Sequence, residues 1–151
     1  MKNQGEFVKI DYSVIPKEVF DLYGAKPFEI AKRKARDEKG NVINNITFSN
    51  AKAEAKKRGC RLPTIMEILV LLHTYRERFP ESASIYHDDF LGIEELSFNE
   101  DVRFEFVDSL ADIPFLRGGR WGNASDAGAF ALDLHCTTGS TGGSIGFRYA
   151  R

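Results

Sequence analysis

The sequence has few cysteines, no long apolar run and almost no net charge. Its two cysteines, Cys60 and Cys136, are too few for the disulfide framework of a small secreted domain, and their spacing alone does not argue for a bridge. No apolar stretch reaches the roughly 18 residues that a transmembrane helix needs, so we expect no membrane insertion. Because the formal net charge is −1, the chain has no overall attraction to nucleic acid, and we expect no nucleic-acid partner.

The beginning of the chain also lacks the apolar core of a secretory signal peptide. We therefore expect synthesis in a cytoplasm. A length of 151 residues suits one domain with a sizeable core, spanning residues 1–151.

The last part of the chain lacks four residue types altogether. No lysine, glutamate, glutamine or methionine occurs between Leu116 and Arg151, although these types make up 25 of the 151 residues. At that frequency about six would be expected in such a window. Its polar positions hold arginine, glycine, aspartate, histidine, cysteine, serine and threonine, and short apolar stretches alternate with them. A fixed apolar frame with varied polar gaps indicates a scaffold that presents a recognition surface.

One strand and one hairpin are predicted near the N-terminus. Alternating side chains over residues 6–12 indicate a strand. Residues 28–43 are compatible with a short helix or a hairpin, and we favour the hairpin because Gly40 and Asn41 are turn residues that precede β-branched ones. The basic run at residues 32–36 is flanked by acidic residues, so we expect a solvated face of this hairpin.

Two helices are predicted from their end signals. Residues 15–23 contain an early proline and an apolar face that includes Leu22, and Gly24 follows as a stop. Residues 50–58 have Ser49 as a candidate N-cap and a glycine directly after them.

A third helix is the best candidate for a central core element. Thr64 and Glu67 form a T-x-x-E capping box at its start. Apolar residues follow at helical spacing up to Phe79, and others widen the stripe, so we expect the first two turns to be buried almost all round.

The second half of the chain predicts short strands. We expect them at residues 102–107, 115–118, 128–134 and 144–149. Side chains that alternate in these strands, together with the single tryptophan, are expected in the core: Trp121, Phe130, Leu132, Leu134 and Phe147. Two main helices followed by a β-rich C-terminal half predict the α+β class.

The sequence has few motifs that are typical of catalysis or metal binding. The sequence has no nucleophile elbow, P-loop or dinucleotide-binding fingerprint, so we expect no enzyme activity and no cofactor. Asp133, His135 and Cys136 are close in sequence, but adjacent strand residues point to opposite faces, and no metal site is expected. We expect residues 87–89 in an acidic surface loop and His73 as a partly exposed helix residue.

Two motifs, about 55 residues apart, resemble one known family. The stretch G-C-RLPT followed by Glu67 and the closing RGG-x-W … GFR frame are similar to the formylglycine-generating-enzyme-like branch of the C-type lectin fold. The resemblance covers roughly the last two thirds of the chain. It implies a C-type-lectin-like fold.

The end of the chain resembles one group of this branch more closely, the variable proteins of diversity-generating retroelements. Their frame, RGG-x-W-x-N-x-x-N-A-G-x-F-A-L-N-L-N-N and then I-G-F-R, matches residues 117–148 here. The resemblance implies that a region at about 117–146 is diversified from a template rich in asparagine codons. It implies these ligand-binding variable positions: Arg120, Gly122, Asp126, Asp133, His135, Cys136, Thr138, Gly139, Ser140, Gly142 and Ser144.

The four residue types that are missing after Leu116 are consistent with diversification from a template rich in asparagine codons. Changing the first two bases of AAC or AAT never produces a codon for lysine, glutamate, glutamine, methionine or tryptophan. A β-rich end dominated by glycine, serine and threonine would also be poor in these residues, so the frame carries more weight than the count.

The resemblance implies a ligand-binding or receptor-binding protein whose partner is a protein or other macromolecular ligand on a target surface. Relatives of this kind are often components of phages or viruses, or cell-surface proteins, and we expect a place on the virion surface or facing the exterior. The alternatives are a formylglycine-generating-enzyme-like oxidoreductase, or a degenerate relative of one, and a plain interaction domain. Two features weigh against sugar binding through calcium and against catalysis: the E-P-N and Q-P-D tripeptides are absent, and neither cysteine lies in the context of an activated thiol.

Overall fold

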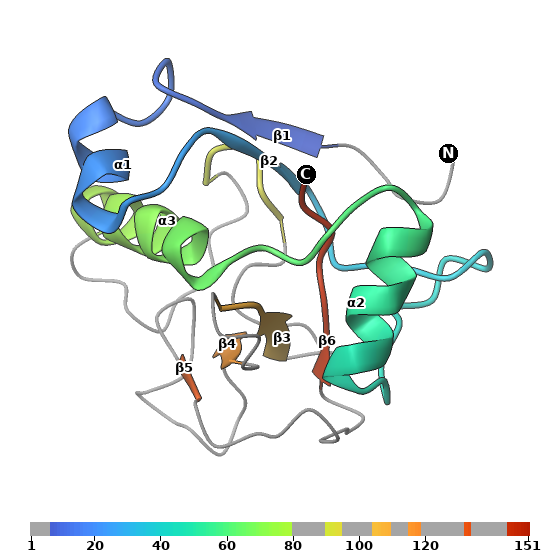
Figure 1. The fold of residues 1–151 in the computed structure, drawn as a ribbon. Helices are drawn as coiled ribbons and strands as arrows, with labels where there is room; N and C mark the ends of the chain where they lie inside the picture. The colour runs from blue at the N-terminus through green and yellow to red at the C-terminus, as the bar shows by residue number, and fades with distance from the viewer. Residues whose placement is uncertain (1–6, 80–89, 95–103, 110–114, 119–131, 134–144) are drawn as a thin grey trace.

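The computed structural model describes residues 7–79, 90–94, 104–109, 115–118, 132–133 and 145–151. Within these residues the chain forms three helices and two small sheets, which confirms the α+β class (Figure 1). In chain order the elements are β1 (Phe7–Ile10), α1 (Lys17–Tyr23), β2 (Phe28–Ala31), α2 (Phe48–Lys57), α3 (Ile65–Arg78), β3 (Phe104–Val107), β4 (Phe115–Gly118), β5 (Leu132–Asp133) and β6 (Ile145–Gly146).

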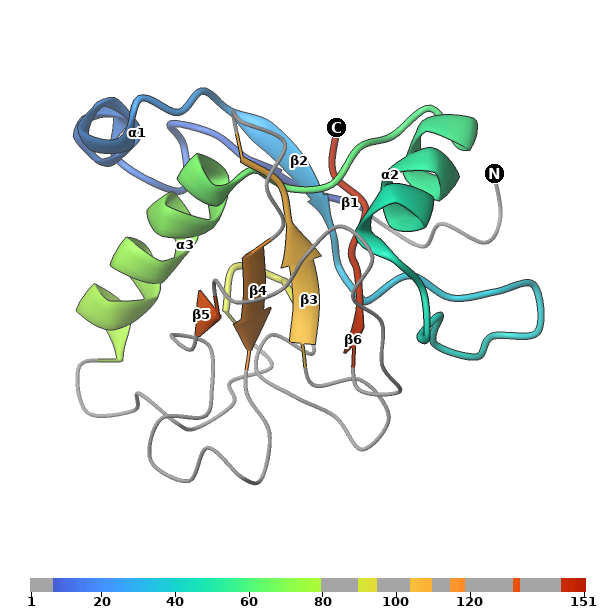
Figure 2. The same cartoon turned by 60° about the horizontal axis from the view of Figure 1, so that its bottom comes forward.

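The larger sheet contains all or part of each of the four strands predicted near the C-terminus. Its order is β5-β4-β3-β6, with β4 antiparallel to both β3 and β5, and with β6 parallel to β3 (Figure 2). At one end of the sheet Phe104 lies between Gly118 and Ile145. In the next row Arg117 lies opposite Leu132.

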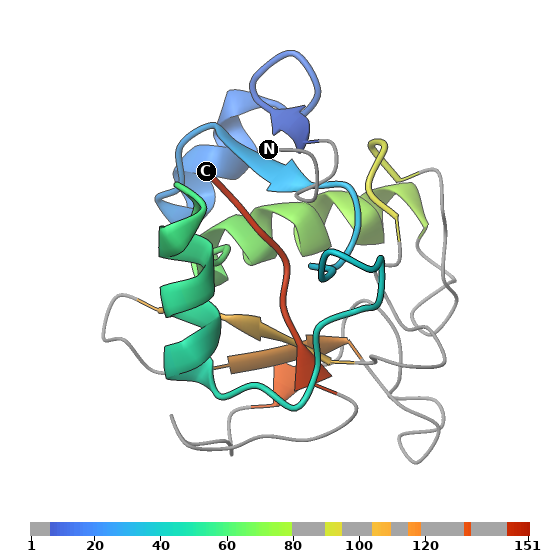
Figure 3. The same ribbon diagram turned by 90° about the vertical axis from the view of Figure 1, so that its right-hand side faces the viewer.

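The C-terminal residues connect this sheet to the smaller one. β1 and β2 pair antiparallel, and residues beyond β6 run along the other edge of β2 (Figures 1 and 3). The Ala31 amide donates to the Tyr149 carbonyl at 2.8 Å, and the Arg151 amide donates to the Glu29 carbonyl at 2.9 Å. The C-terminal segment therefore belongs to both sheets.

Helix α1 buries a narrower face than its sequence suggests. Val19 and Phe20 are buried, but Leu22 is 65% exposed and does not contribute to the predicted apolar face. Successive helix residues are rotated by about 100°, so Leu22 lies about 200° from Phe20 and faces the other way. Gly24 ends the helix with a φ of 67°, as predicted, in a left-handed conformation that suits glycine.

Thr47, and not Ser49, caps α2. The hydroxyl of Thr47 accepts a hydrogen bond from the Asn50 amide at 3.1 Å, whereas Ser49 lies inside the helix. Both residue types are good caps, and packing decides between them. Phe48 is buried against Phe106, with 5.7 Å between the ring centroids, and this contact makes Phe48 the first helical residue.

Helix α3 has the predicted capping box. The Glu67 amide donates to the Thr64 hydroxyl at 3.2 Å, and the Thr64 amide donates to the Glu67 carboxylate at 2.9 Å. The buried residues are spread around its first two turns, as expected: Ile65, Glu67, Ile68, Val70 and Leu71.

The hairpin after β2 is confirmed at its turn. Arg36 pairs with Val42, and the Asp37 amide donates to the Asn41 carbonyl at 2.8 Å. The basic run before this turn is not uniformly solvated, because Lys34 is buried. Its neighbour Ala35 donates its amide to the Phe147 carbonyl, which holds this stretch against the C-terminal segment.

Buried side chains form two clusters. The larger one packs α1 and α3 against β1 and β2, and the smaller one packs α2 against the C-terminal segment. The smaller cluster consists of Ala31, Ala35, Phe48, Ala51, Ala55, Leu62, Phe106, Phe147 and Tyr149.

Candidate functional site

Asp133 is the one predicted variable position among the described residues. It lies in β5, opposite Leu116 of β4. The other predicted positions lie outside the described residues: Arg120, Gly122, Asp126, His135, Cys136, Thr138, Gly139, Ser140, Gly142 and Ser144. Of the frame residues expected in the core, Phe147 is confirmed as buried, Leu132 lies in β5, and Trp121, Phe130 and Leu134 lie outside the described residues.

The strand ends that border the predicted variable segments lie together. Gly118 precedes residues 119–131, and Leu132 follows them; Ile145 follows residues 134–144. Gly118 and Ile145 both pair with Phe104, and Leu132 pairs with the residue before Gly118. All three strand ends are therefore at one end of the four-stranded sheet, the end toward which the β4 arrow points in Figure 2.

A buried ion pair holds the GFR part of the frame. The Arg148 guanidinium donates from Nε to a carboxylate oxygen of Glu105 at 2.9 Å, and both side chains are almost fully buried. It also donates to the carbonyls of Ala31 at 3.0 Å and Lys32 at 2.7 Å. One side chain thus joins β3, the end of β2 and the C-terminal segment.

The RLPT element holds the opposite end of the same sheet. The Asp108 amide, just after β3, donates to the Pro63 carbonyl at 2.9 Å, and the Ile65 amide donates to the Asp108 carbonyl at 2.7 Å. Arg61 exchanges two backbone hydrogen bonds with Ala150, at 2.9 and 2.7 Å. The motif therefore ties α3 to β3 and to the C-terminal segment.

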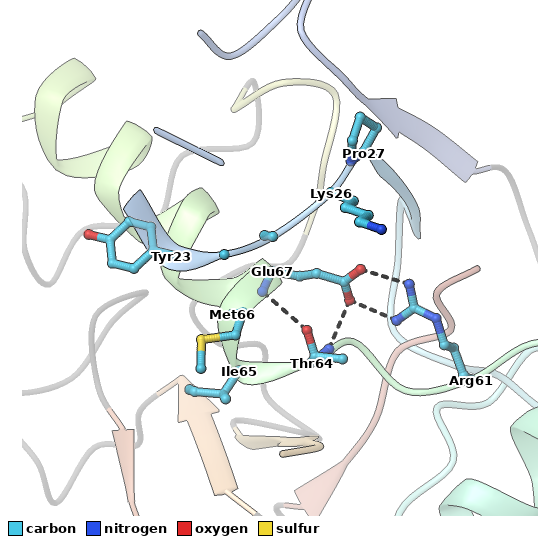
Figure 4. Close-up of a pocket in the computed structure, with 10 residues that line it drawn as sticks. Tyr23, Lys26, Pro27, Arg61, Thr64, Ile65, Met66 and Glu67 are labelled. Atoms are coloured by element: carbon cyan, nitrogen blue, oxygen red, sulfur yellow. Dashed lines mark hydrogen bonds and ion pairs between the residues drawn. The ribbon is translucent and has the colours of Figure 1, made fainter. Parts of the chain in front are cut away.

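The side chains of this element form a second ion pair. The Arg61 guanidinium donates two hydrogen bonds of 2.7 Å to the two carboxylate oxygens of Glu67 (Figure 4). These bonds raise the pKa of Arg61 above its usual value, against the effect of burial. Sequence reasoning missed both ion pairs. The available signal was a charged residue within an apolar stretch, as Glu105 is between Phe104 and Phe106.

A pocket of about 390 Å³ opens beside Glu67. The connection between α1 and β2 forms one wall, and the RLPT element with the first turn of α3 forms the other (Figure 4). Its polar groups are Lys26, Thr64 and the Arg61–Glu67 pair, and its apolar groups include Tyr23 and Met66.

Cys60 lies at a second pocket of about 280 Å³, beside Lys52 and Lys56 of α2. Burial raises the pKa of its thiol, although Arg151 and Arg58 act in the other direction. A nucleophilic cysteine needs a lowered pKa, so this thiol lacks the activation that catalysis requires.

A chain of hydrogen bonds joins α1 to α3. The Tyr23 hydroxyl lies 3.0 Å from Nδ1 of His73, and Nε2 of His73 lies 3.0 Å from a carboxylate oxygen of Glu77. His73 is partly exposed, as predicted. The chain fixes the imidazole between a hydroxyl and a carboxylate and links the two helices.

Among the described residues, no cluster of three or more histidine, cysteine, aspartate or glutamate side chains could hold a metal ion. No helix in this part of the chain has the length and apolar character needed to cross a membrane. Comparisons of the chain with protein-family models, with curated proteins and with solved structures found no match.

Proposed function

We propose that this chain is a ligand-binding protein with a C-type-lectin-like fold, and that a retroelement diversifies its surface between about residues 117 and 146. The observation that carries the proposal is the common position of Gly118, Leu132 and Ile145 at one end of the four-stranded sheet. The predicted variable residues fall almost entirely in the two segments that these strand ends border. The fourth bordering residue, Asp133, pairs with Leu116, one residue further into the sheet. Two segments that are both anchored at one end of a sheet can contribute to one surface.

Diversification also needs a scaffold that does not depend on the varied side chains. Buried groups outside the varied positions hold the frame here, above all Phe147 and the ion pair between Arg148 and Glu105. A well-packed core keeps its structure when exposed side chains change, since surface substitutions usually alter stability by about 0.5 kcal/mol or less.

The ligand that fits this proposal is a macromolecular surface. Variable positions spread over about 25 residues suit a broad contact better than a single deep pocket. A receptor-binding component of a phage or virus is the carrier that we propose.

The alternative of a formylglycine-generating-enzyme-like oxidoreductase finds less support. Such chemistry uses a pair of cysteines. Cys60 has a thiol whose pKa is raised by burial, which is the direction opposite to activation.

Sequencing the DNA around the coding region tests the proposal. We expect a reverse-transcriptase gene and a near-identical copy of the segment that encodes residues 117–151. Differences between the two copies should fall at adenines of the template and at codons of the predicted variable positions.

Codons for the buried residues provide the internal control. Those for Phe147 and Arg148 should be identical in both copies. Differences that spread evenly over all bases, or the absence of any second copy, would overturn diversification by a retroelement.

A further inference from the structure

We propose that the pocket between the α1–β2 connection and the first turn of α3 is a second binding site, and that its ligand is a small organic anion with an apolar body and a carboxylate. The site is separate from the proposed variable surface. Its walls are residues 23–27 and 61–67, so it exists whether or not residues 117–146 are diversified.

The charge of the pocket favours an anion. Arg61 and Glu67 neutralise each other through two hydrogen bonds of 2.7 Å. Lys26 is exposed and forms no ion pair with any described residue. Lys26 lies on the wall formed by the α1–β2 connection, and Figure 4 shows its ammonium turned toward the Arg61–Glu67 pair, so the pocket lining carries one net positive charge.

The start of α3 does not supply the anion site. Three amides at the start of α3 are already bonded: those of Thr64 and Glu67 within the capping box, and that of Ile65 to the Asp108 carbonyl. The Glu67 carboxylate would also repel a second anion placed directly against it. We therefore expect the carboxylate of the ligand at Lys26, which stands at the other wall.

Apolar groups make up the rest of the lining. Tyr23, Pro27, Ile65 and Met66 all contribute to the pocket. A volume of about 390 Å³ lies in the range of small-molecule sites, which combine a mostly apolar lining with a few polar groups. A ligand with an aromatic or branched body would cover these side chains while its carboxylate meets Lys26.

The position of the pocket separates it from the proposed recognition surface. Thr64 pairs with Asp108, which follows the last residue of β3. In contrast, Gly118 and Ile145, two of the residues that border the variable segments, pair with Phe104, the first residue of β3. The two sites therefore lie at opposite ends of β3. The pocket at one end of β3 could bind the same ligand in every variant, while the proposed variable surface at the other end differs between variants.

Titration with 3-phenylpropionate, followed by amide chemical shifts of the whole chain, tests the site. We expect saturable shifts at Lys26, Met66 and Glu67, with a dissociation constant on the order of 1 mM for a ligand of this size. The uncharged 3-phenylpropanamide should bind at least tenfold more weakly, and acetate should give no saturable shifts at Met66.

Two variants and one control sharpen the test. Lys26→Gln should weaken binding of 3-phenylpropionate at least tenfold. Met66→Glu places a negative charge in the pocket at a helix start and should abolish binding, and its amide spectrum shows whether the variant is folded. Lys39→Gln, at the exposed turn after β2, should bind as the parent does.

A peptide that ends in phenylalanine distinguishes the sources of such a carboxylate. Tighter binding of the free-acid peptide than of 3-phenylpropionate would identify a chain terminus, and weaker binding a small molecule. An unchanged affinity of Lys26→Gln, an equal loss in Lys39→Gln, or no saturable shifts with 3-phenylpropionate would overturn the proposal. None of these results depends on the variable surface.

Discussion

At the scale of single residues, the Arg148–Glu105 pair bears most directly on the frame. Both side chains are nearly inaccessible, and Arg148 also donates to two carbonyls. Arg148→Met would remove the guanidinium and leave the Glu105 carboxylate buried. We expect the free energy of unfolding to fall by about 3–5 kcal/mol, measured by urea denaturation.

The double variant Arg148→Met/Glu105→Leu separates charge from packing. Replacing both members of a buried pair often restores stability, so the double variant should be more stable than Arg148→Met alone. Arg148→Lys is the matched control for charge, because it keeps the positive charge and loses the planar guanidinium. A loss below about 1 kcal/mol in Arg148→Met would contradict the role assigned to the pair.

Tyr149 gives a pH-dependent prediction. Its side chain is fully buried, its hydroxyl has no hydrogen-bond partner in the described part of the chain, and burial raises its pKa above the ordinary value of 10.0. The unfolded chain therefore loses this proton first. Since the folded chain then holds more protons, stability is fully present below about pH 10 and falls as the pH rises beyond it.

Tyr149→Phe should reduce this alkaline loss while changing stability at pH 7 by no more than about 1 kcal/mol. The comparison is best made in a Cys60→Ala background, because burial raises the pKa of Cys60 as well and gives a loss of the same sign. Urea denaturation at a series of pH values measures it. Tyr12→Phe, at an exposed tyrosine, is the matched control for the loss of a hydroxyl group. The prediction is wrong if Tyr149→Phe and its background lose the same free energy at high pH.

At the scale of elements, residues close in sequence predicted where helices end better than they predicted which side chains are buried. The capping box of α3 and the glycine stop of α1 depend on nearby residues alone, and both were predictable. The start of α2 was not, since Thr47 and Ser49 are equivalent by residue type and the buried Phe48 decides between them. Burial of Lys34 likewise depends on contacts with a distant segment, whereas the exposure of Leu22 follows from its position on the helix, about 200° from Phe20.

The caps of α2 and α3 provide a direct comparison. Thr47→Ala and Thr64→Ala should each lower the free energy of unfolding by about 1 kcal/mol, because each hydroxyl accepts a hydrogen bond from a helix amide. Ser49→Ala, inside α2, should change stability by less than about 0.5 kcal/mol or raise it slightly, given the high helix propensity of alanine. Thermal and urea denaturation of the three variants measure this order. A larger loss in Ser49→Ala than in Thr47→Ala would contradict the observed cap.

At the scale of the whole molecule, the sequence predicted which strands exist but not how they are ordered. Residues 115–118 form a strand with the predicted bounds, and the strands at 104–107 and 145–146 are shorter than expected. Nothing local specifies that β6 pairs parallel with β3, or that residues after β6 continue along β2. The first pairing joins Phe104 to Ile145, which are 41 residues apart. The second joins segments more than 100 residues apart, as does the hydrogen bond between Arg148 and the Ala31 carbonyl.

A prediction for the whole molecule is that the fold tolerates substitutions at the predicted variable positions. A library that randomises codons at Asp126, Asp133, His135, Ser140 and Ser144 should consist mostly of folded clones, because packing is supplied by other residues and each change should cost at most about 0.5 kcal/mol. Protease resistance of displayed clones measures the folded fraction. In contrast, Phe147→Ala should cost about 3–5 kcal/mol, since Phe147 is fully buried.

Selection of this library against an immobilised protein such as streptavidin extends the test from tolerance to recognition. We expect binders whose sequences converge at the randomised positions, and whose binding is lost when those positions return to the parent residues. A matched library with five exposed positions outside residues 117–146, Ser13, Lys17, Glu18, Asp21 and Lys39, should fold equally well and yield few binders. The prediction fails if the first library is mostly unfolded or if both libraries yield binders equally often, because either result would show that the sheet end presents no special recognition surface.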